Sequence, residues 1–286
     1  MAKGMRDIKR KIKSTQNMKQ ITKAMEMIAA SRLKRAQDAA QSARPYAEKL
    51  REVIGAIASA GGVQHPMLEK RPIKRTGYIV ITSDRGLAGG YNANLLRKLM
   101  QMLREKHNNN PAEFSIYVIG RKGRDFLRRR GVPIAYETTG LAAFPRFSDI
   151  KAIAATAVKA YENGEVDELI LVYNEFRSAI SQTPVDKTLL PLATDETKGA
   201  TATYEFEPSP EAVLNHILPR YAETLVYSAV LEGKASEFGA RMTAMSKATK
   251  NATTMINTLT LQYNRARQAS ITQEITEIVA GANALG

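Results

Sequence analysis

One segment of the sequence has residue types and spacing that suit phosphate binding. Residues 84–90, Asp-Arg-Gly-Leu-Ala-Gly-Gly, follow a predicted strand and precede a predicted helix. Backbone amides at the start of a helix bind phosphate in many α/β proteins. The segment lacks the Gly-Lys-Ser/Thr ending of a P-loop and the glycine spacing of a dinucleotide fingerprint. A tight strand-to-helix crossover is therefore the favoured interpretation, and a Rossmann-like nucleotide enzyme is the alternative.

Other residues that could carry out catalysis are few and scattered. The chain has no cysteine, which excludes disulfides, thiolate zinc sites and thiol nucleophiles. Its three histidines, His65, His107 and His216, are far apart in the sequence and lack metal-ligand spacing. No Ser–His–acid or paired-carboxylate pattern stands out. We therefore expect a chain with no catalytic residue, cofactor or metal of its own.

The charge of the chain is high and unevenly distributed. The 286 residues carry a formal net charge of +14. In residues 1–35, eleven lysines and arginines outnumber Asp7 and Glu26, which leaves a net charge of +9. Residues 241–267 contain basic residues and no acid. Such surfaces suit nucleic acid, anionic lipid or an acidic protein surface equally well, and a solvated helix face is the simpler alternative.

Neither secretion nor membrane insertion is expected. No apolar run approaches the roughly 20 residues that a membrane-spanning helix needs. The basic start, MAKGMRDIKRKIKS, lacks the apolar core of a signal peptide. Asp7, Ile8 and Ile12 fit a folded helix better than a transit peptide. The sequence indicates an intracellular protein.

Small and apolar residues recur in steps of three and four at both ends of the chain. At the C-terminal end they are Leu231, Ala235, Phe238, Met242, Met245, Thr249, Ala252, Ile256, Leu259, Tyr263, Ala266 and Ser270. At the N-terminal end they are Thr15, Met18, Thr22, Met25, Ala29, Leu33, Ala36, Ala40, Ala43, Ala47, Leu50, Ile54 and Ile57. This period of about 3.5 predicts an antiparallel coiled coil, kinked at Pro45. Two unrelated amphipathic helices packed on a globule are the alternative.

Between residues 76 and 206, short β-rich runs alternate with helical ones. The predicted strands are 77–82, 114–119, 132–137, 168–174, 176–181, 185–192 and 204–206, and the predicted helices are 93–106, 122–130 and 148–161. This alternation predicts a mainly parallel, Rossmann-like sheet with helices on its faces. The fold class is therefore α/β plus a long antiparallel coiled coil. The predicted domains are residues 1–60, 73–206 and 209–286, with the sheet domain inserted between the N- and C-terminal helices.

The two terminal helices differ in expected length. A helix over residues 3–57 is about 80 Å long, whereas 75 residues at the C-terminal end make about 110 Å. If both start from one domain, the last part of the C-terminal helix, residues 271–286, extends past its partner. This apolar tip has no lysine or arginine and contains Ile271, Ile275, Ile278, Val279 and Leu285. Because a lone apolar helix is poorly stable in water, we expect a partner that encloses it.

Three stretches resemble the gamma subunit of F-type ATP synthases. They are ITKAMEMIA at residues 21–29, SDRGLAGGYN at 83–92 and ITQEITEIVAGA at 271–282, the last being the most specific. The order of coiled coil, α/β domain and coiled coil also matches, so the resemblance covers essentially the whole chain. It implies a non-catalytic rotary shaft in a hexamer of alternating alpha and beta subunits, which hold ATP or ADP and magnesium. The epsilon subunit and the membrane c ring are further implied partners, and nucleic acid is not.

The resemblance also implies which residues meet those partners. The positions that contact the alpha and beta subunits are Met25, Arg241, Arg267, Gln268, Thr272 and Glu274. The apolar tip would turn in an apolar bearing, and Tyr204 and Phe206 fall where the family meets the c ring. Ala88 is a departure, since many relatives have cysteine there. The chain also lacks the cysteine-bearing regulatory insertion of chloroplast forms, so redox control is not expected.

The resemblance further implies a location. With no transit peptide predicted, we expect a bacterial form that is bound peripherally to the cytoplasmic face of the cell membrane, through the complex alone. The alternative function is a basic coiled-coil protein that binds nucleic acid. That alternative leaves the apolar tip without an explanation.

Overall fold

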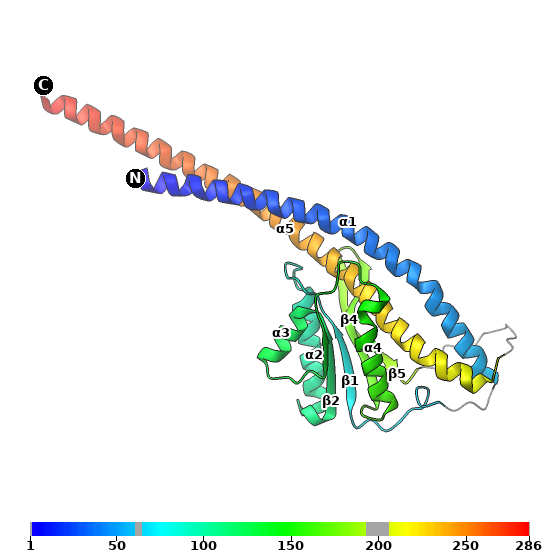
Figure 1. The fold of residues 1–286 in the computed structure, drawn as a ribbon. Coiled ribbons are helices and arrows are strands. Elements are labelled where there is room, and N and C mark those ends of the chain that lie inside the picture. The colour runs from blue at the N-terminus through cyan, green and yellow to red at the C-terminus, as the bar shows by residue number, and fades with distance from the viewer. Residues whose placement is uncertain (1, 61–64, 193–205, 286) are drawn as a thin grey trace. The chain divides into compact units, whose positions relative to one another are not determined.

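A computed structural model describes residues 2–60, 65–192 and 206–285 of the chain (Figure 1). The chain divides into two compact units. The helical unit comprises residues 1–28 and 242–286, and the sheet unit comprises residues 29–241.

Two long helices, α1 (Ala2–Ala60) and α5 (Pro210–Leu285), contribute residues to both units. Each continues through an internal proline, Pro45 in α1 and Pro219 in α5. The Ser209 hydroxyl accepts the Ala212 amide at 3.2 Å at the start of α5. Pro210 follows as the first helical residue, where its missing N–H costs no helical hydrogen bond. The prediction of a long helix at each end of the chain is confirmed.

The sheet unit contains one five-stranded sheet. Its strands are β1 (Thr76–Ile81), β2 (Phe114–Ile119), β3 (Tyr136–Thr138), β4 (Glu168–Ser178) and β5 (Ser181–Leu190). They lie in the order β3-β2-β1-β4-β5, with the first four parallel and β5 antiparallel to β4. The predicted mainly parallel, Rossmann-like sheet is confirmed.

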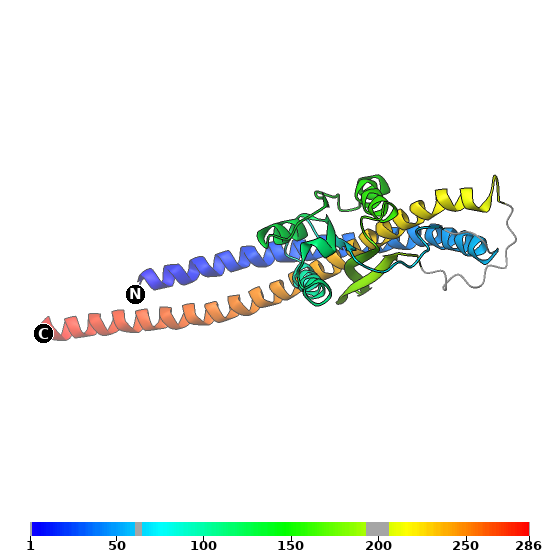
Figure 2. The ribbon, with the colours of Figure 1, turned by 90° about the horizontal axis from the view of Figure 1, so that it is seen from below.

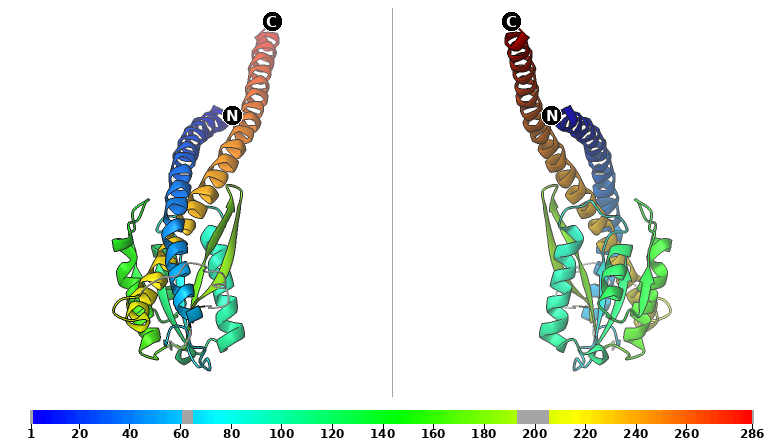
Figure 3. Two further views of the ribbon diagram at one scale, coloured as in Figure 1. Left: turned by 90° about the vertical axis from the view of Figure 1, so that its right-hand side faces the viewer. Right: turned by 90° about the vertical axis from the view of Figure 1, so that its left-hand side faces the viewer.

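Helices cover both faces of this sheet. They are α2 (Tyr91–His107), followed by the short turn η1 (Pro111–Glu113), then α3 (Arg121–Arg129) and α4 (Phe147–Glu162). Successive strand residues point to opposite faces, so Tyr78 and Val80 pack on the side of α2 and α3. Ile79 and Ile81 pack on the side of α4 and α5. Figure 3 shows α2 and α4 on opposite sides of the sheet.

Two strand predictions in the sheet unit need correction. The strand predicted over 132–137 is shorter, since β3 begins at Tyr136. Pro133 has no N–H for the ladder, and the Val132 amide instead donates to the Leu127 carbonyl at the end of α3. The run 176–181 is not a separate strand, because β4 continues through Phe176 to Ser178. The strand predicted over 204–206 lies almost wholly outside the described residues.

In the helical unit, the covered face of α5 follows the predicted seam. Among residues 251–270, the side chains that are not exposed are Ala252, Thr253, Ile256, Leu259, Tyr263, Ala266 and Ser270. All but Thr253 are predicted seam positions. In α1 the seam is also confirmed, except that Met18 is 56% exposed and Lys19 is half-buried in its place. The aliphatic stem of a lysine can cover apolar surface while its amine stays in water.

The contacts between the two helices show that they run antiparallel in this unit. The Thr249 hydroxyl donates to the Thr22 hydroxyl at 2.8 Å, and the Thr15 hydroxyl lies 3.8 Å from Met255 Sδ. If the same pairing continues from Thr15 to Ala2, the N-terminal end of α1 lies beside α5 near residue 268. In Figure 2 the C-terminal end of α5 accordingly runs past the N-terminal end of α1. The predicted extension of α5 beyond its partner is confirmed.

Two histidines, one buried and one half-buried, make the stability of the sheet unit depend on pH. His107 is 6% exposed, and its Nε2 lies 2.8 Å from the Tyr78 hydroxyl. Burial lowers its pKa below the ordinary 6.5, although the nearby Glu113 carboxylate opposes this effect. Burial also lowers the pKa of His65, against a hydrogen bond with Asn215.

We therefore expect the free energy of unfolding to fall with decreasing pH from about 6.5 downwards. Between the unfolded and the folded pKa, the histidines of the unfolded chain are protonated and those of the folded chain are not, which favours unfolding. The loss of stability ends once the pH lies below the folded pKa. Urea titrations at about pH 8 and about pH 5.5 measure it. A His107→Gln variant, which keeps a hydrogen-bonding side chain, should lose less over the same interval. An identical loss in both proteins would contradict the role of His107.

Candidate functional site

The loop after β1 lies where a nucleotide-binding sheet holds phosphate, since ligands of parallel α/β sheets bind at the carboxyl ends of the strands. In this chain the Asp84 carboxylate accepts the backbone amides of Arg121 at 3.0 Å and Gly140 at 2.8 Å. The Lys122 amide donates to the Ser83 carbonyl, and the Gly123 amide donates to the Thr82 hydroxyl. The first three amides of α3 are therefore bonded to the chain itself instead of to a phosphate.

The same loop connects β1 to α2, as the crossover interpretation predicts. Asn92 ties its two ends together: Oδ1 accepts the Ser83 amide at 3.0 Å, and Nδ2 donates to the Ser83 hydroxyl at 2.7 Å. Leu87 has a φ of 61°, which is rare for a leucine, and is 64% exposed. The loop thus has a tightly fastened base and an apolar side chain at its exposed part.

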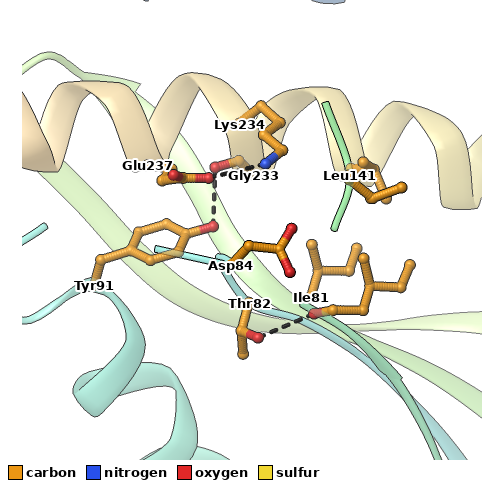
Figure 4. A pocket seen from close by; sticks show the side chains of 10 residues that line it. Ile81, Thr82, Asp84, Tyr91, Leu141, Gly233, Lys234 and Glu237 are labelled. Carbon is orange, nitrogen blue, oxygen red and sulfur yellow. Dashed lines mark hydrogen bonds and ion pairs between the residues drawn. The ribbon is translucent and has the colours of Figure 1, made fainter. Parts of the chain in front are cut away.

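Helix α5 covers the carboxyl edge of the sheet next to this loop (Figure 4). The Tyr91 hydroxyl donates to the Gly233 carbonyl at 2.9 Å, and burial raises the pKa of Tyr91, as does the Glu237 charge. A Cβ atom on Gly233 would lie 3.3 Å from Ile81 Cγ2, so glycine permits the close approach. The cavity that remains has a volume of about 10 Å³, which is the size of one water molecule. It is far too small for a nucleotide.

Three charged side chains of α5 are buried at this edge, and we refer to them as the charged cluster. Lys234, Glu237 and Arg241 are 9%, 5% and 9% exposed. Lys234 Nζ lies 3.2 Å from Glu237 Oε2, and Arg241 Nη2 lies 2.8 Å from Glu237 Oε1. Their spacing of three and four residues places them on one face of the helix. The carboxylate therefore joins two cations on successive turns of α5.

Arg241 also holds the loop after β1. Its Nη2 donates to the carbonyls of Gly86 at 3.2 Å and Arg85 at 3.5 Å. The resemblance assigns this residue a contact with the beta subunit. In the chain by itself the side chain is buried in the sheet unit, so the direct contact remains a prediction.

The other predicted contact residues belong to the helical unit. Arg267, Gln268, Thr272 and Glu274 are all exposed, and we call these four the collar. The Ser270 hydroxyl lies 3.3 Å from Glu274 Oε1 on the same helix. Met25 of α1 is half-buried in the seam. The structure thus places the collar within eight residues of α5, where each side chain is accessible to a partner.

The apolar tip is exposed along its described length. Ile271, Ile275, Ile278 and Val279 are 47%, 56%, 71% and 53% exposed. The side chain of Leu285 and the whole of Tyr204 lie outside the described residues. Phe206 is half-buried and packs against the core on the α4 and α5 side of the sheet.

Three residues of this site, Tyr91, Lys234 and Glu237, do not stand out in the sequence. A weak indication of their role does exist in the sequence. Gly233 and Gly239 lie inside a long helix, where each glycine lowers helix stability by about 1 kcal/mol relative to alanine. Glycines kept at such positions point to close packing. Lys234 and Glu237 also adjoin the seam residues Ala235 and Phe238.

The described part of the chain has neither a candidate metal site nor a candidate membrane span. Among its side chains, no group of three or more His, Cys, Asp or Glu residues could hold a metal ion. None of its helices has a stretch that is both long and apolar enough to cross a bilayer.

Solved structures with the same fold come from mitochondrial ATP synthases. A chain in the central stalk and c-ring structure from Tetrahymena thermophila is 30% identical, with a TM-score of 0.61 over 80% of this chain and 99% of that one. A chain from the Euglena gracilis OSCP, F1 and c-ring structure is 20% identical, with a TM-score of 0.75 over 100% of this chain and 95% of that one. The second likeness, at this low identity, supports the fold alone.

Sequence comparison identifies the family. A family model described as ATP synthase matches residues 4–285. The ATP synthase gamma chain of Brevibacillus brevis is 63% identical over 286 residues, which cover 99% of both chains. The cavity too small for a nucleotide and the two paired long helices agree with these matches. The matches show that the chain belongs to the gamma-chain family of ATP synthases.

Proposed function

We propose that the chain turns with its apolar tip inside a sleeve formed by the alpha and beta subunits of an F-type ATP synthase. Its family makes it a central-stalk rotor subunit that is itself non-catalytic. The observation that carries the proposal is that every side chain over residues 271–283 is exposed. An apolar helix of this length gains stability in water only when another surface covers it.

The chemistry of the apolar tip suits a surface that must turn. Its isoleucine and valine side chains make contacts that have no preferred direction, because the hydrophobic effect depends on buried area. Rotation against an apolar sleeve therefore breaks no hydrogen bond or ion pair at each step. Glu274 and Glu277 are the acids of this segment, and Gln273 Nε2 donates to Glu277 within the helix at 2.7 Å.

The collar is proposed to contact loops of the beta subunits, with Met25 and Arg241 as further contact residues. Arg267 and Gln268 offer several donors on flexible, exposed side chains. Charge-assisted hydrogen bonds to acidic loops form and break readily at such a surface. The support is the exposure of the collar and the family positions that these residues match.

The remaining assignments concern the membrane side of the complex. We propose that the chain consists of a coiled-coil segment of residues 1–60, a sheet domain of residues 73–206 and a second coiled-coil segment of residues 209–286. The sheet domain binds the epsilon subunit. Tyr204 and Phe206 face the c ring. The relatives from Tetrahymena and Euglena were solved together with a c ring, which supports this placement. The complex would lie on the cytoplasmic face of a bacterial cell membrane, and this chain would reach the membrane through its partners alone.

Reconstitution tests the proposed function. We expect alpha and beta subunits assembled with this chain to hydrolyse ATP several-fold faster than the same subunits without it, because the shaft drives the catalytic sites through their conformations. A heat-unfolded sample of the chain is the control. Equal ATPase activity with and without the folded chain would contradict the proposal. Tight DNA binding that weakens steeply with salt would favour the nucleic-acid alternative instead.

A further inference from the structure

We propose that Glu237 is a positioning residue, whose buried carboxylate fixes Arg241 and thereby fastens the loop over residues 84–88 to α5. The inference deepens the proposed function and rests on it, because it names a contact that holds the loop after β1 to the part of α5 that lies in the sheet unit. It concerns the sheet unit alone. Glu237 is not among the residues to which the sequence motifs or the family resemblance give a role.

The geometry gives each carboxylate oxygen of Glu237 its own cation. Oε1 lies 2.8 Å from Arg241 Nη2, and Oε2 lies 3.2 Å from Lys234 Nζ. The side chain of Glu237 is 6% exposed, so water screens these pairs little. The shorter of the two pairs, with Arg241, holds the carboxylate against the guanidinium whether or not Lys234 carries its charge. Glu237 is therefore a rigid anchor for Arg241.

Arg241 transmits this orientation to the loop. The same Nη2 that pairs with Glu237 also donates to the carbonyls of Gly86 and Arg85. One of its two hydrogens is directed at the carboxylate, which leaves the other for the loop. If the carboxylate loses its charge, the guanidinium loses the partner that orients it.

The loop needs this support because its backbone is strained. Leu87 adopts a left-handed φ of 61°, which is unfavourable for a leucine. From the sheet side the loop is held by the Asp84 carboxylate, and from the helix side by Arg241. The loop is therefore fastened to the amides of Arg121 and Gly140 through Asp84, and to α5 through Arg241.

The balance of charge explains why Glu237 matters more than Lys234. The charged cluster contains two cations and one acid, and Asp84 lines the same small cavity as Lys234 and Glu237 (Figure 4). Neutralising Glu237 leaves two cations of α5 buried on successive turns without their shared counter-charge, which is strongly unfavourable. Neutralising Lys234 leaves the pair of Glu237 and Arg241 intact. The two substitutions should therefore have different effects on the loop.

Hydrogen exchange in the full chain tests the attachment directly. In the loop the Ser83 amide bonds to Asn92 Oδ1 and the Tyr91 amide bonds to the Ala88 carbonyl. We expect Glu237→Gln to speed exchange of these two amides roughly tenfold, which corresponds to about 1.4 kcal/mol. Lys234→Met, the matched control, should leave them protected. Unchanged protection in Glu237→Gln, or an equal loss in both variants, would overturn the inference.

Arg241→Lys covers the case in which Glu237→Gln does not fold. Lysine keeps the charge beside Glu237 but lacks the planar group that reaches two acceptors at once. This variant should fold and still lose loop protection. If it retains full protection, Arg241 does not hold the loop and the inference fails.

A coupling measurement separates positioning from a merely structural role. In the reconstituted holoenzyme, we expect Glu237→Gln to lower the number of protons pumped per ATP hydrolysed, for each assembled complex, and Lys234→Met to leave this ratio unchanged. A loss of stability alone would reduce the amount of assembled complex without changing the ratio. An unchanged ratio in Glu237→Gln would overturn the inference. Failure of the unaltered chain to stimulate ATPase activity would instead overturn the proposed function.

Discussion

A Gly120→Ala variant is expected to lose roughly 3–5 kcal/mol of its free energy of unfolding, which is among the largest effects of a single methyl group. Gly120 precedes α3 with a φ of 100°, a conformation that side chains rarely adopt. A Cβ atom there would collide with the backbone carbonyl of Thr82. Since Thr82 is tied to this segment by its own hydrogen bonds, neither side can move away.

Gly131→Ala is the matched control for this prediction. Gly131 also has a positive φ, of 68°, but a Cβ atom built on it meets nothing within 4 Å. This variant should lose about 1 kcal/mol, from backbone strain alone. Urea unfolding of both variants measures the difference. If the two losses are equal, the collision with Thr82 is not what makes Gly120 necessary.

Arg267→Ala and Gln268→Ala are expected to impair coupling in the holoenzyme while the chain stays folded. Both side chains are exposed, and neither has a hydrogen bond or ion pair with any other residue that the structure describes. Their removal should change the free energy of unfolding by less than about 0.5 kcal/mol. A charge-assisted hydrogen bond to a partner contributes about 1.5–3 kcal/mol, so each variant should lose roughly tenfold or more in ATP-driven pumping.

Gln262→Ala provides the control for the collar variants. Gln262 is exposed on the same helix, six residues before Gln268, and is outside the collar. It should leave both stability and pumping unchanged. Undiminished rotation and proton pumping in Arg267→Ala and Gln268→Ala would count against their assignment as contact residues.

Much of the fold follows from local patterns in the sequence. A helix repeats every 3.6 residues and a strand every two, so the seam through Ile256, Tyr263 and Ser270 and the buried run of β1 are visible without any tertiary information. The extension of the apolar tip also follows from local quantities, since it needs only the lengths of two helices. This reasoning fails at Met18, which is exposed. The covered position of the seam lies one residue later, at Lys19.

The charged cluster could not be predicted in the same way. Arg241 meets Gly86 across 155 residues of sequence, and Tyr91 meets Gly233 across 142. No periodic pattern connects residues so far apart. Lys234 and Glu237 also have the composition of an ordinary solvated helix face, and only the packing of α5 against the sheet edge buries them. The late start of β3 could not be predicted either, because it depends on the hydrogen bond from the Val132 amide to the Leu127 carbonyl.

The pairing of Thr22 with Thr249 has a consequence for the synthesis of the chain. The two residues are 227 positions apart, and a ribosome that adds about 5–20 residues per second needs roughly 11–45 s to make the interval. Throughout that delay the first turns of α1 lack the helix that covers their seam. All five strands are translated within the same interval, so the sheet can form first. The pairing of the two helices in this region is therefore expected to be the last part of the fold to form.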